Sequence, residues 1–139
     1  MSDFERCLKE RRLLQVEASP EMVSKEMGSA GYDLGSAVDS LDEDDFKWAS
    51  IQAYYSMFHA AKALVLAKGY REKSHSCLRV ALRELYPKQK ALADDLEMCM
   101  DLRHEADYAS TYDKESAEIA VKKAEKFLDK AQEMLRRPQ

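Results

Sequence analysis

The sequence predicts an all-α protein, an up-and-down antiparallel helical bundle of about five helices that forms a single domain over residues 1–139. First, residues 48–69 are apolar in almost every direction around a helix and polar along only one narrow strip, which is typical of a helix enclosed by others. Second, only four glycines and three prolines interrupt the chain. Third, no run of β-branched residues alternates as a strand would.

The first part of the chain predicts two helices. Residues 2–15 form an amphipathic segment with Phe4 and Cys7 on its apolar side. Ser19 is a typical N-cap, and Pro20 suits the first helical position, where its missing N–H costs nothing. The apolar residues that follow are spaced by three or four, and we expect this seam to lie against residues 48–69: Val23, Met27, Ala30, Leu34, Ala37 and Leu41.

Three glycines interrupt this second predicted helix. Gly28, Gly31 and Gly35 each cost up to about 1 kcal/mol relative to alanine, so we expect a close approach of another helix to offset them. A phosphate-binding loop is excluded because no strand precedes the glycines.

The central helix has a recognisable start and end. Acidic residues at 42–45 place negative charge at its N-terminus, and Gly69 can end it in a left-handed cap. Gln52, His59 and Lys62 interrupt the apolar run, so the segment does not span a membrane.

Three further helices are predicted over residues 74–87, 88–108 and 113–135, with N-caps at Ser74 and Asp113. Basic side chains gather at the start of the first of these helices, where they form either a solvated basic face or a small anion-binding patch: Arg71, Lys73, His75, Arg79 and Arg83. In the helix predicted over residues 88–108, Arg103 falls on the apolar face with Leu96 and Cys99. An arginine in that position is paired or faces a cavity or interface.

The overall charge and the cysteines restrict the function. A net charge of −4 gives the molecule no general footprint for nucleic acid, so such binding requires a local patch. We interpret Cys7, Cys77 and Cys99 as reduced thiols of a cytoplasmic protein, and the charged N-terminus has no signal-peptide core. Neither His59 nor His75 has a ligand partner at helical spacing, so we expect no metal and no cofactor.

Residues 102–108, with the sequence LRHEADY, are the strongest candidate for chemistry. Arg103 could stabilise the charge of a phosphorane, and His104 could transfer the proton that RNA cleavage requires. The alternative is structural, with Arg103 paired to Asp107 one turn later.

The segments QAYYSMFHAAKALVLAKGYREKSHSCL, LRHEADY and KESAEIAVKKAEKFL together resemble the small stand-alone HEPN domains, named for nucleotide binding in higher eukaryotes and prokaryotes. The resemblance implies a bundle of about five helices that commonly dimerises and often works beside a small nucleotidyltransferase as a toxin–antitoxin pair. It also implies that active members cut RNA without a metal, using an arginine, four to six intervening residues and then a histidine. Here Arg103 matches the arginine, Tyr108 stands at the usual histidine position, and His104 follows the arginine directly.

We therefore expect a dimeric module that binds a nucleotide or RNA in a nucleotidyltransferase-linked, toxin–antitoxin type of system, without full RNase activity. The expected ligand-binding residues are Arg103, Asp107, Tyr108, Lys73, His75 and Arg79. One alternative is a metal-independent endoribonuclease toxin with Arg103, His104 and Tyr108 as catalytic residues. The other is a helical adaptor that binds no ligand.

Overall fold

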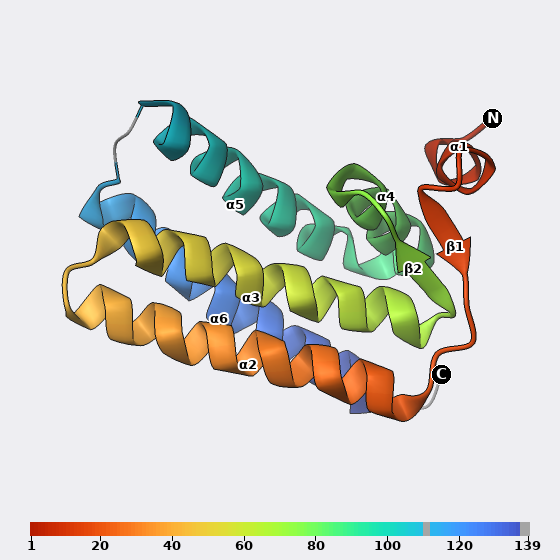
Figure 1. The fold of residues 1–139 in the computed structure, drawn as a ribbon, viewed down its shortest axis with the longest axis horizontal. Helices are drawn as coiled ribbons and strands as arrows, with labels where there is room; N and C mark the ends of the chain where they lie inside the picture. The colour runs from red at the N-terminus through yellow and green to blue at the C-terminus, as the bar shows by residue number, and fades with distance from the viewer. Residues whose placement is uncertain (110–111, 137–139) are drawn as a thin grey trace.

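A computed structural model describes residues 1–109 and 112–136, with the side chains of residues 106–109 left out of the description. Helix α3 lies at the centre of the bundle, with α2 antiparallel to it and α6 behind the pair, in contact with both (Figure 1). The elements are α1 (Asp3–Lys9), β1 (Leu13–Gln15), α2 (Pro20–Asp42), α3 (Phe46–Ala67), β2 (Tyr70–Glu72), α4 (His75–Leu85), the 3-10 turn η1 (Pro87–Gln89), α5 (Lys90–Ala109) and α6 (Lys114–Arg136). The predicted all-α helical bundle is confirmed.

Helix α3 is the helix around which the core forms, as its sequence predicts. Twelve of its residues are buried, including Met57 and Leu64 with no exposed surface. Asp45 caps its start, because its Oδ1 accepts a hydrogen bond from the Trp48 N–H at 3.3 Å. Gly69 follows its end with a φ of +88°, the left-handed conformation that glycine adopts most readily. Both predicted boundaries of this helix are confirmed to within two residues.

Helix α2 packs along α3 through the predicted seam, with Ala30 and Ala37 fully buried. The expectation about its glycines is wrong. Gly28, Gly31 and Gly35 are exposed, and a Cβ atom added to any of them would meet no atom within 4 Å. They lie on the solvent side of α2, so no close helix approach offsets their cost.

The N-terminal segment differs from the predicted helix over residues 2–15. Helix α1 ends at Lys9, and Arg11 then takes a positive φ of 58°. The chain continues as β1, which pairs antiparallel with β2 so that Leu13 lies opposite Glu72 and Gln15 opposite Tyr70. Strands of three residues are too short to show an alternating pattern, and their hydrogen-bond partners lie far away in the sequence.

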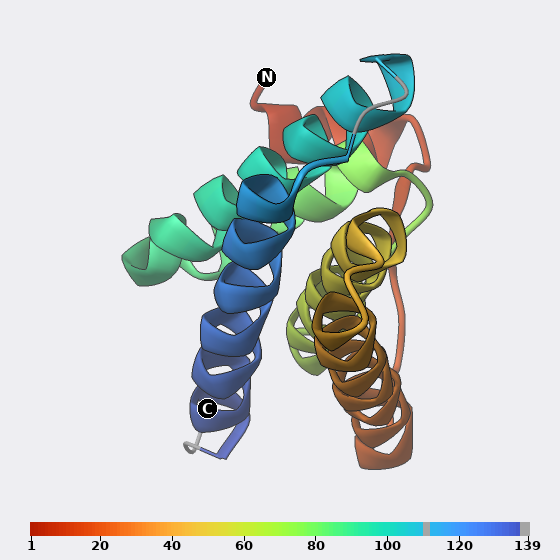
Figure 2. The same cartoon turned by 90° about the vertical axis from the view of Figure 1, so that its left-hand side faces the viewer.

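The cysteine expectation is also corrected. A disulfide joins Cys7 of α1 to Cys77 of α4, whose Cα atoms lie 5.9 Å apart, so these two residues are not reduced thiols. The β1–β2 pairing brings α1 beside α4, as both views show (Figures 1 and 2), and so places two residues 70 positions apart within bonding reach. Cys99 is a free, buried thiol, as expected, and its burial raises its pKa to about 12.

Helices α4, α5 and α6 complete the bundle, and α5 crosses over α6 (Figure 2). Ser74 caps α4 by accepting the N–H of Cys77 at 3.1 Å, and Asp113 accepts the N–H of Ser116 at 2.7 Å before α6, as predicted. One face of α6 is buried along its length, including Ala117, Ala124 and Phe127. Within the described part of the chain, none of the helices has the length and apolar character needed to cross a bilayer.

We predict that reducing the disulfide lowers the stability of the fold. Closing a loop of 70 residues restricts the unfolded chain and should contribute about 2–4 kcal/mol. Thermal unfolding followed by circular dichroism should show a lower Tm in dithiothreitol. A Cys7→Ser/Cys77→Ser variant should have the same low Tm with and without the reductant. Equal Tm values for the oxidised and reduced wild-type chain would contradict the prediction.

Candidate functional site

The arginine of the LRHEADY segment lies against the central helix. The Arg103 Cζ atom is 5.2 Å from the ring centroid of Tyr54 and 5.0 Å from that of Tyr55, so its guanidinium lies over two aromatic rings of α3. Tyr54 is buried, whereas Tyr55 is 38% exposed. The two rings hold a permanent cation at a place where α5 meets α3 and where part of the surface remains open.

A histidine from a third helix reaches the same place. His75 is the first residue of α4, and its Nδ1 lies 2.9 Å from the hydroxyl of Tyr54. Its ring also contacts Phe58 edge-on, with centroids 4.5 Å apart. The Ser74 cap fixes the start of α4, so the backbone that carries this imidazole is held firmly. His75 is therefore both a helix-start residue, as predicted, and part of a site.

These side chains enclose a small cavity of about 190 Å³. It is lined by Tyr54, His75, Met100, Arg103 and His104, which come from α3, α4 and α5. His104 is exposed at its edge. The cavity is large enough for a phosphate group but smaller than the roughly 300–1,000 Å³ of pockets that enclose whole small molecules.

The protonation states suit an anionic ligand. Burial raises the pKa of Tyr54 to about 12, against the opposing effect of Arg103 and with a smaller contribution from Tyr55. Partial burial lowers the pKa of His75, and the positive charges of Arg103 and Lys62 lower it further. Near pH 7 the phenol is thus protonated and the imidazole neutral. Together they present hydrogen-bonding groups beside one fixed cation, an arrangement that can bind a phosphate oxygen.

The structure brings together only some of the predicted site residues. Arg103, His104 and His75 line one cavity. Arg79 lies elsewhere, with its Nη1 3.5 Å from Glu97 Oε1, and it lines a different cavity beside α1. Lys73 is exposed, and its backbone N–H donates to the Arg12 carbonyl at 2.8 Å.

Two predicted residues, Asp107 and Tyr108, lie in the last turns of α5, and their side chains are outside the described residues. Sequence reasoning missed Tyr54 as a site residue. Its signal was a pair of adjacent tyrosines inside an alanine-rich helix, but nothing in the sequence links Tyr54 to His75 or Arg103.

A second polar cluster joins α2 to α3. His59 Nδ1 lies 2.7 Å from Glu26 Oε2, and its Nε2 lies 3.7 Å from Asp33 Oδ2. Lys62 also approaches Glu26, at 3.6 Å. His59 is thus hydrogen-bonded inside the bundle, and its partners are carboxylates. Among the described residues, no group of three histidine, cysteine or carboxylate side chains could hold a metal ion.

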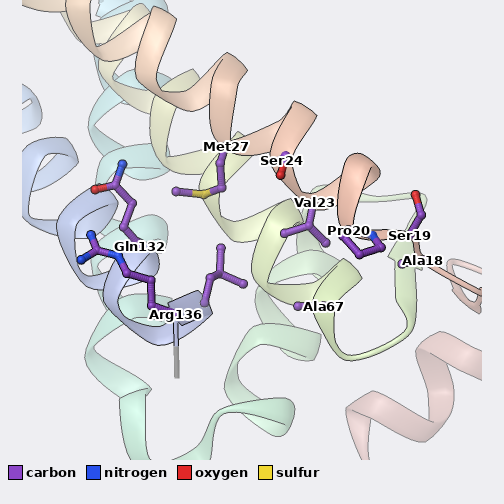
Figure 3. Close-up of a pocket in the computed structure, with 10 residues that line it drawn as sticks. Ala18, Ser19, Pro20, Val23, Ser24, Met27, Ala67, Gln132 and Arg136 are labelled. Atoms are coloured by element: carbon purple, nitrogen blue, oxygen red, sulfur yellow. The ribbon is translucent and has the colours of Figure 1, made fainter. Parts of the chain in front are cut away.

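A larger cavity, of about 610 Å³, lies between the start of α2 and the end of α6. Figure 3 shows Met27 reaching from α2 toward Gln132 and Arg136 of α6. Val23 and Ala67 contribute apolar surface, and Arg136 is its charged residue. The cavity contains no acid–base pair and shares no residue with the Arg103 cavity.

We predict that Arg103 lowers the pKa of His75 through space. Replacing Arg103 with alanine removes a positive charge that disfavours the imidazolium, so the pKa of His75 should rise. An NMR titration of the imidazole resonances measures this. The resonances of His59, which faces carboxylates on α2, serve as the reference within the same sample. An unchanged or lowered pKa for His75 would show that the two side chains do not share a site.

Comparison with known proteins identifies the family. Residues 24–134 match the HEPN domain model. A UPF0332 protein of Archaeoglobus fulgidus is 40% identical over 86 residues, 57% of this chain and 67% of its own length. Two Methanocaldococcus jannaschii proteins are also similar: "Putative toxin MJ0605", 32% identical over 66% of this chain and 72% of its own length, and "Putative toxin MJ0142", 29% identical over 81% of each chain. The chain belongs to the HEPN domain family.

Proposed function

We propose that this HEPN domain binds RNA or a nucleotide by holding a phosphate group in the Arg103 cavity. The observation that supports this most directly is the guanidinium of Arg103, which lies over Tyr54 and Tyr55 and lines a cavity with His75 and His104. Arginine suits phosphate because its planar donors match two oxygens at once. The net charge of −4 makes such a local site necessary for an anionic ligand.

We further propose that the binding unit is a homodimer. A cavity of about 190 Å³ holds a phosphate but not a nucleoside, so a second copy placed opposite would supply the remaining surface. Asp107 and Tyr108, one turn or more after Arg103, are our proposed residues for the cleft between the two copies. Lys73 and Arg79 are then proposed contacts for more distant phosphates of a longer RNA.

The proposed setting is a cytoplasmic toxin–antitoxin type of system with a small nucleotidyltransferase as partner. The names of the two similar Methanocaldococcus jannaschii proteins support the toxin part of this proposal. The nucleotidyltransferase partner rests on the HEPN resemblance described above. A gene for a small nucleotidyltransferase next to the gene for this chain would support it further.

The first test is RNA binding by an Arg103→Ala variant. Losing a charge-assisted contact costs about 1.5–3 kcal/mol, so the Kd for a fluorescent single-stranded RNA should rise by roughly ten- to a hundredfold. The Kd of Arg103→Lys should lie between those of the wild type and Arg103→Ala, because lysine keeps the charge but loses the planar donors. Arg6→Ala, a change at an exposed arginine of α1, is the matched control and should bind like the wild type. Equal Kd values for Arg103→Ala and Arg6→Ala would refute the site.

The second test is the oligomeric state. Light scattering should give twice the mass of one chain. A monomer would remove the shared cleft and favour the adaptor alternative. In that alternative, Arg103→Ala would lower the Tm, because the arginine covers Tyr54 and Tyr55, without changing any ligand affinity.

A second candidate function is a metal-independent endoribonuclease. The specific observation that favours it is an imidazole, His75, in the same cavity as the motif arginine, although no histidine follows His104 in the sequence.

A further inference from the structure

We propose that His75, oriented by Tyr54, is the proton-transfer residue with which this site cleaves RNA, and that it acts from α4, outside the LRHEADY segment. The inference rests on the proposed function, in which Arg103 binds an RNA phosphate. It deepens that function by assigning the acid–base chemistry to a residue that no motif in the sequence identifies.

The geometry places His75 as a general base requires. It lines the same cavity as Arg103, so a phosphate held by the guanidinium lies within reach of the imidazole. Its Nδ1 is 2.9 Å from the Tyr54 hydroxyl, and among the described residues its Nε2 has no hydrogen-bond partner. A proton-transfer residue needs this combination of one ring nitrogen that is held and one that is available.

Tyr54 is a positioning residue in this scheme. Its phenol oxygen can accept a hydrogen bond from Nδ1–H, and this tautomer leaves the lone pair on Nε2. The phenol itself does not serve as the base, because its pKa of about 12 keeps it protonated at neutral pH. Phe58 also contacts the imidazole, with its ring edge-on and the two centroids 4.5 Å apart, and this contact limits the rotation of the imidazole.

The charged and titratable groups around His75 keep it unprotonated. Tyr54 and Lys62 face it from α3, and Arg103 and His104 line the cavity from α5. Partial burial is the first cause of its lowered pKa, followed by Arg103 and then Lys62. A base that is already neutral near pH 7 can accept a proton from a sugar hydroxyl during the reaction.

The reaction balances within the RNA and these residues. Nε2 of His75 takes the proton of a ribose 2′-hydroxyl, and the 2′-oxygen forms a bond to the adjacent phosphorus. Arg103 stabilises the added negative charge on the phosphoryl oxygens. The bond from phosphorus to the 5′-oxygen breaks, and that oxygen receives the proton that Nε2 of His75 took up, relayed by a water molecule. The products are a 2′,3′-cyclic phosphate and a 5′-hydroxyl.

The test is a cleavage assay on the full chain with a 3′-labelled single-stranded RNA in the presence of a chelator. The rate and the cyclic-phosphate product are measured beside the Kd of a 2′-deoxy version of the same oligonucleotide, which can bind but not react. His75→Ala should lower the rate at least about a hundredfold and raise that Kd less than about tenfold, the cost of one neutral hydrogen bond. Tyr54→Phe should lower the rate about tenfold and raise the Kd by a smaller factor. Added imidazole should partly restore the cleavage rate of His75→Ala.

The matched control is His59→Gln, a change at a histidine that faces Glu26 and Asp33 away from the cavity, and it should keep the wild-type rate. If His75→Ala fails to fold, as judged by circular dichroism, His75→Gln replaces it and should show the same loss. The wild-type rate should rise with pH through the lowered pKa of His75 and then level off.

The outcomes separate the two proposals. RNA binding that requires Arg103, without any cleavage, would overturn the role of His75 and leave the proposed function standing. Wild-type rates of cleavage in both His75→Ala and His75→Gln would overturn that role in the same way. If the wild-type chain neither binds nor cleaves the RNA, both proposals are overturned. Cleavage that survives Arg103→Ala unchanged comes from another nuclease and counts against His75.

Discussion

The burial of α3 is the constraint on which the rest of this structure depends. A helix that is apolar in nearly every direction must be surrounded, and α2, α6, α4 and α5 each contact it. Its polar groups therefore have to find partners inside the bundle. The Ser56 hydroxyl donates a hydrogen bond to the Ala30 carbonyl of α2 at 2.7 Å, and the His59 ring is hydrogen-bonded to Glu26, also of α2. By the same rule, the buried hydroxyl of Tyr54 is paired with His75.

The candidate site follows from that rule. The polar end of Tyr54 needs a partner, and the partner is an imidazole at the start of α4, where Arg103 of α5 also lies. The start of α4 is held in three ways: by the Ser74 cap, by the hydrogen bond between Tyr54 and His75, and by the disulfide at Cys77, two residues further on. The site residues thus stand on rigid elements, as precise positioning of a phosphate or a proton requires.

Local signals predicted the helices well. The caps at Ser19, Ser74 and Asp113 are present, and the apolar seam of α2 faces α3. What could not be predicted depends on contacts between distant parts of the chain. The pairing of β1 with β2 joins residues more than fifty positions apart, and the Cys7–Cys77 disulfide joins two helices that are 70 positions apart in the sequence. The prediction for the three glycines of α2 was wrong because each follows a seam residue directly, which turns it about 100° away from the face that packs on α3.

The site was predictable only in part, for the same reason. An arginine in line with apolar residues is a local anomaly, and it correctly marked Arg103 as a side chain that faces inward. His75 was singled out for its place in a basic segment, and nothing in that segment indicates that it meets Tyr54 rather than Arg79. The basic segment is in fact divided, with His75 at one cavity and Arg79 at another.

The exposed glycines of α2 also bear on how the chain folds. A segment of 23 residues with three glycines and no neighbour over them has a weak tendency to form a helix in isolation. Its helical state must then arise together with its contacts to α3. We conclude that α2 and α3 form one cooperative unit, so that disrupted packing at Ala30 or Ala37 would melt the whole of α2 instead of letting it separate as an intact rod.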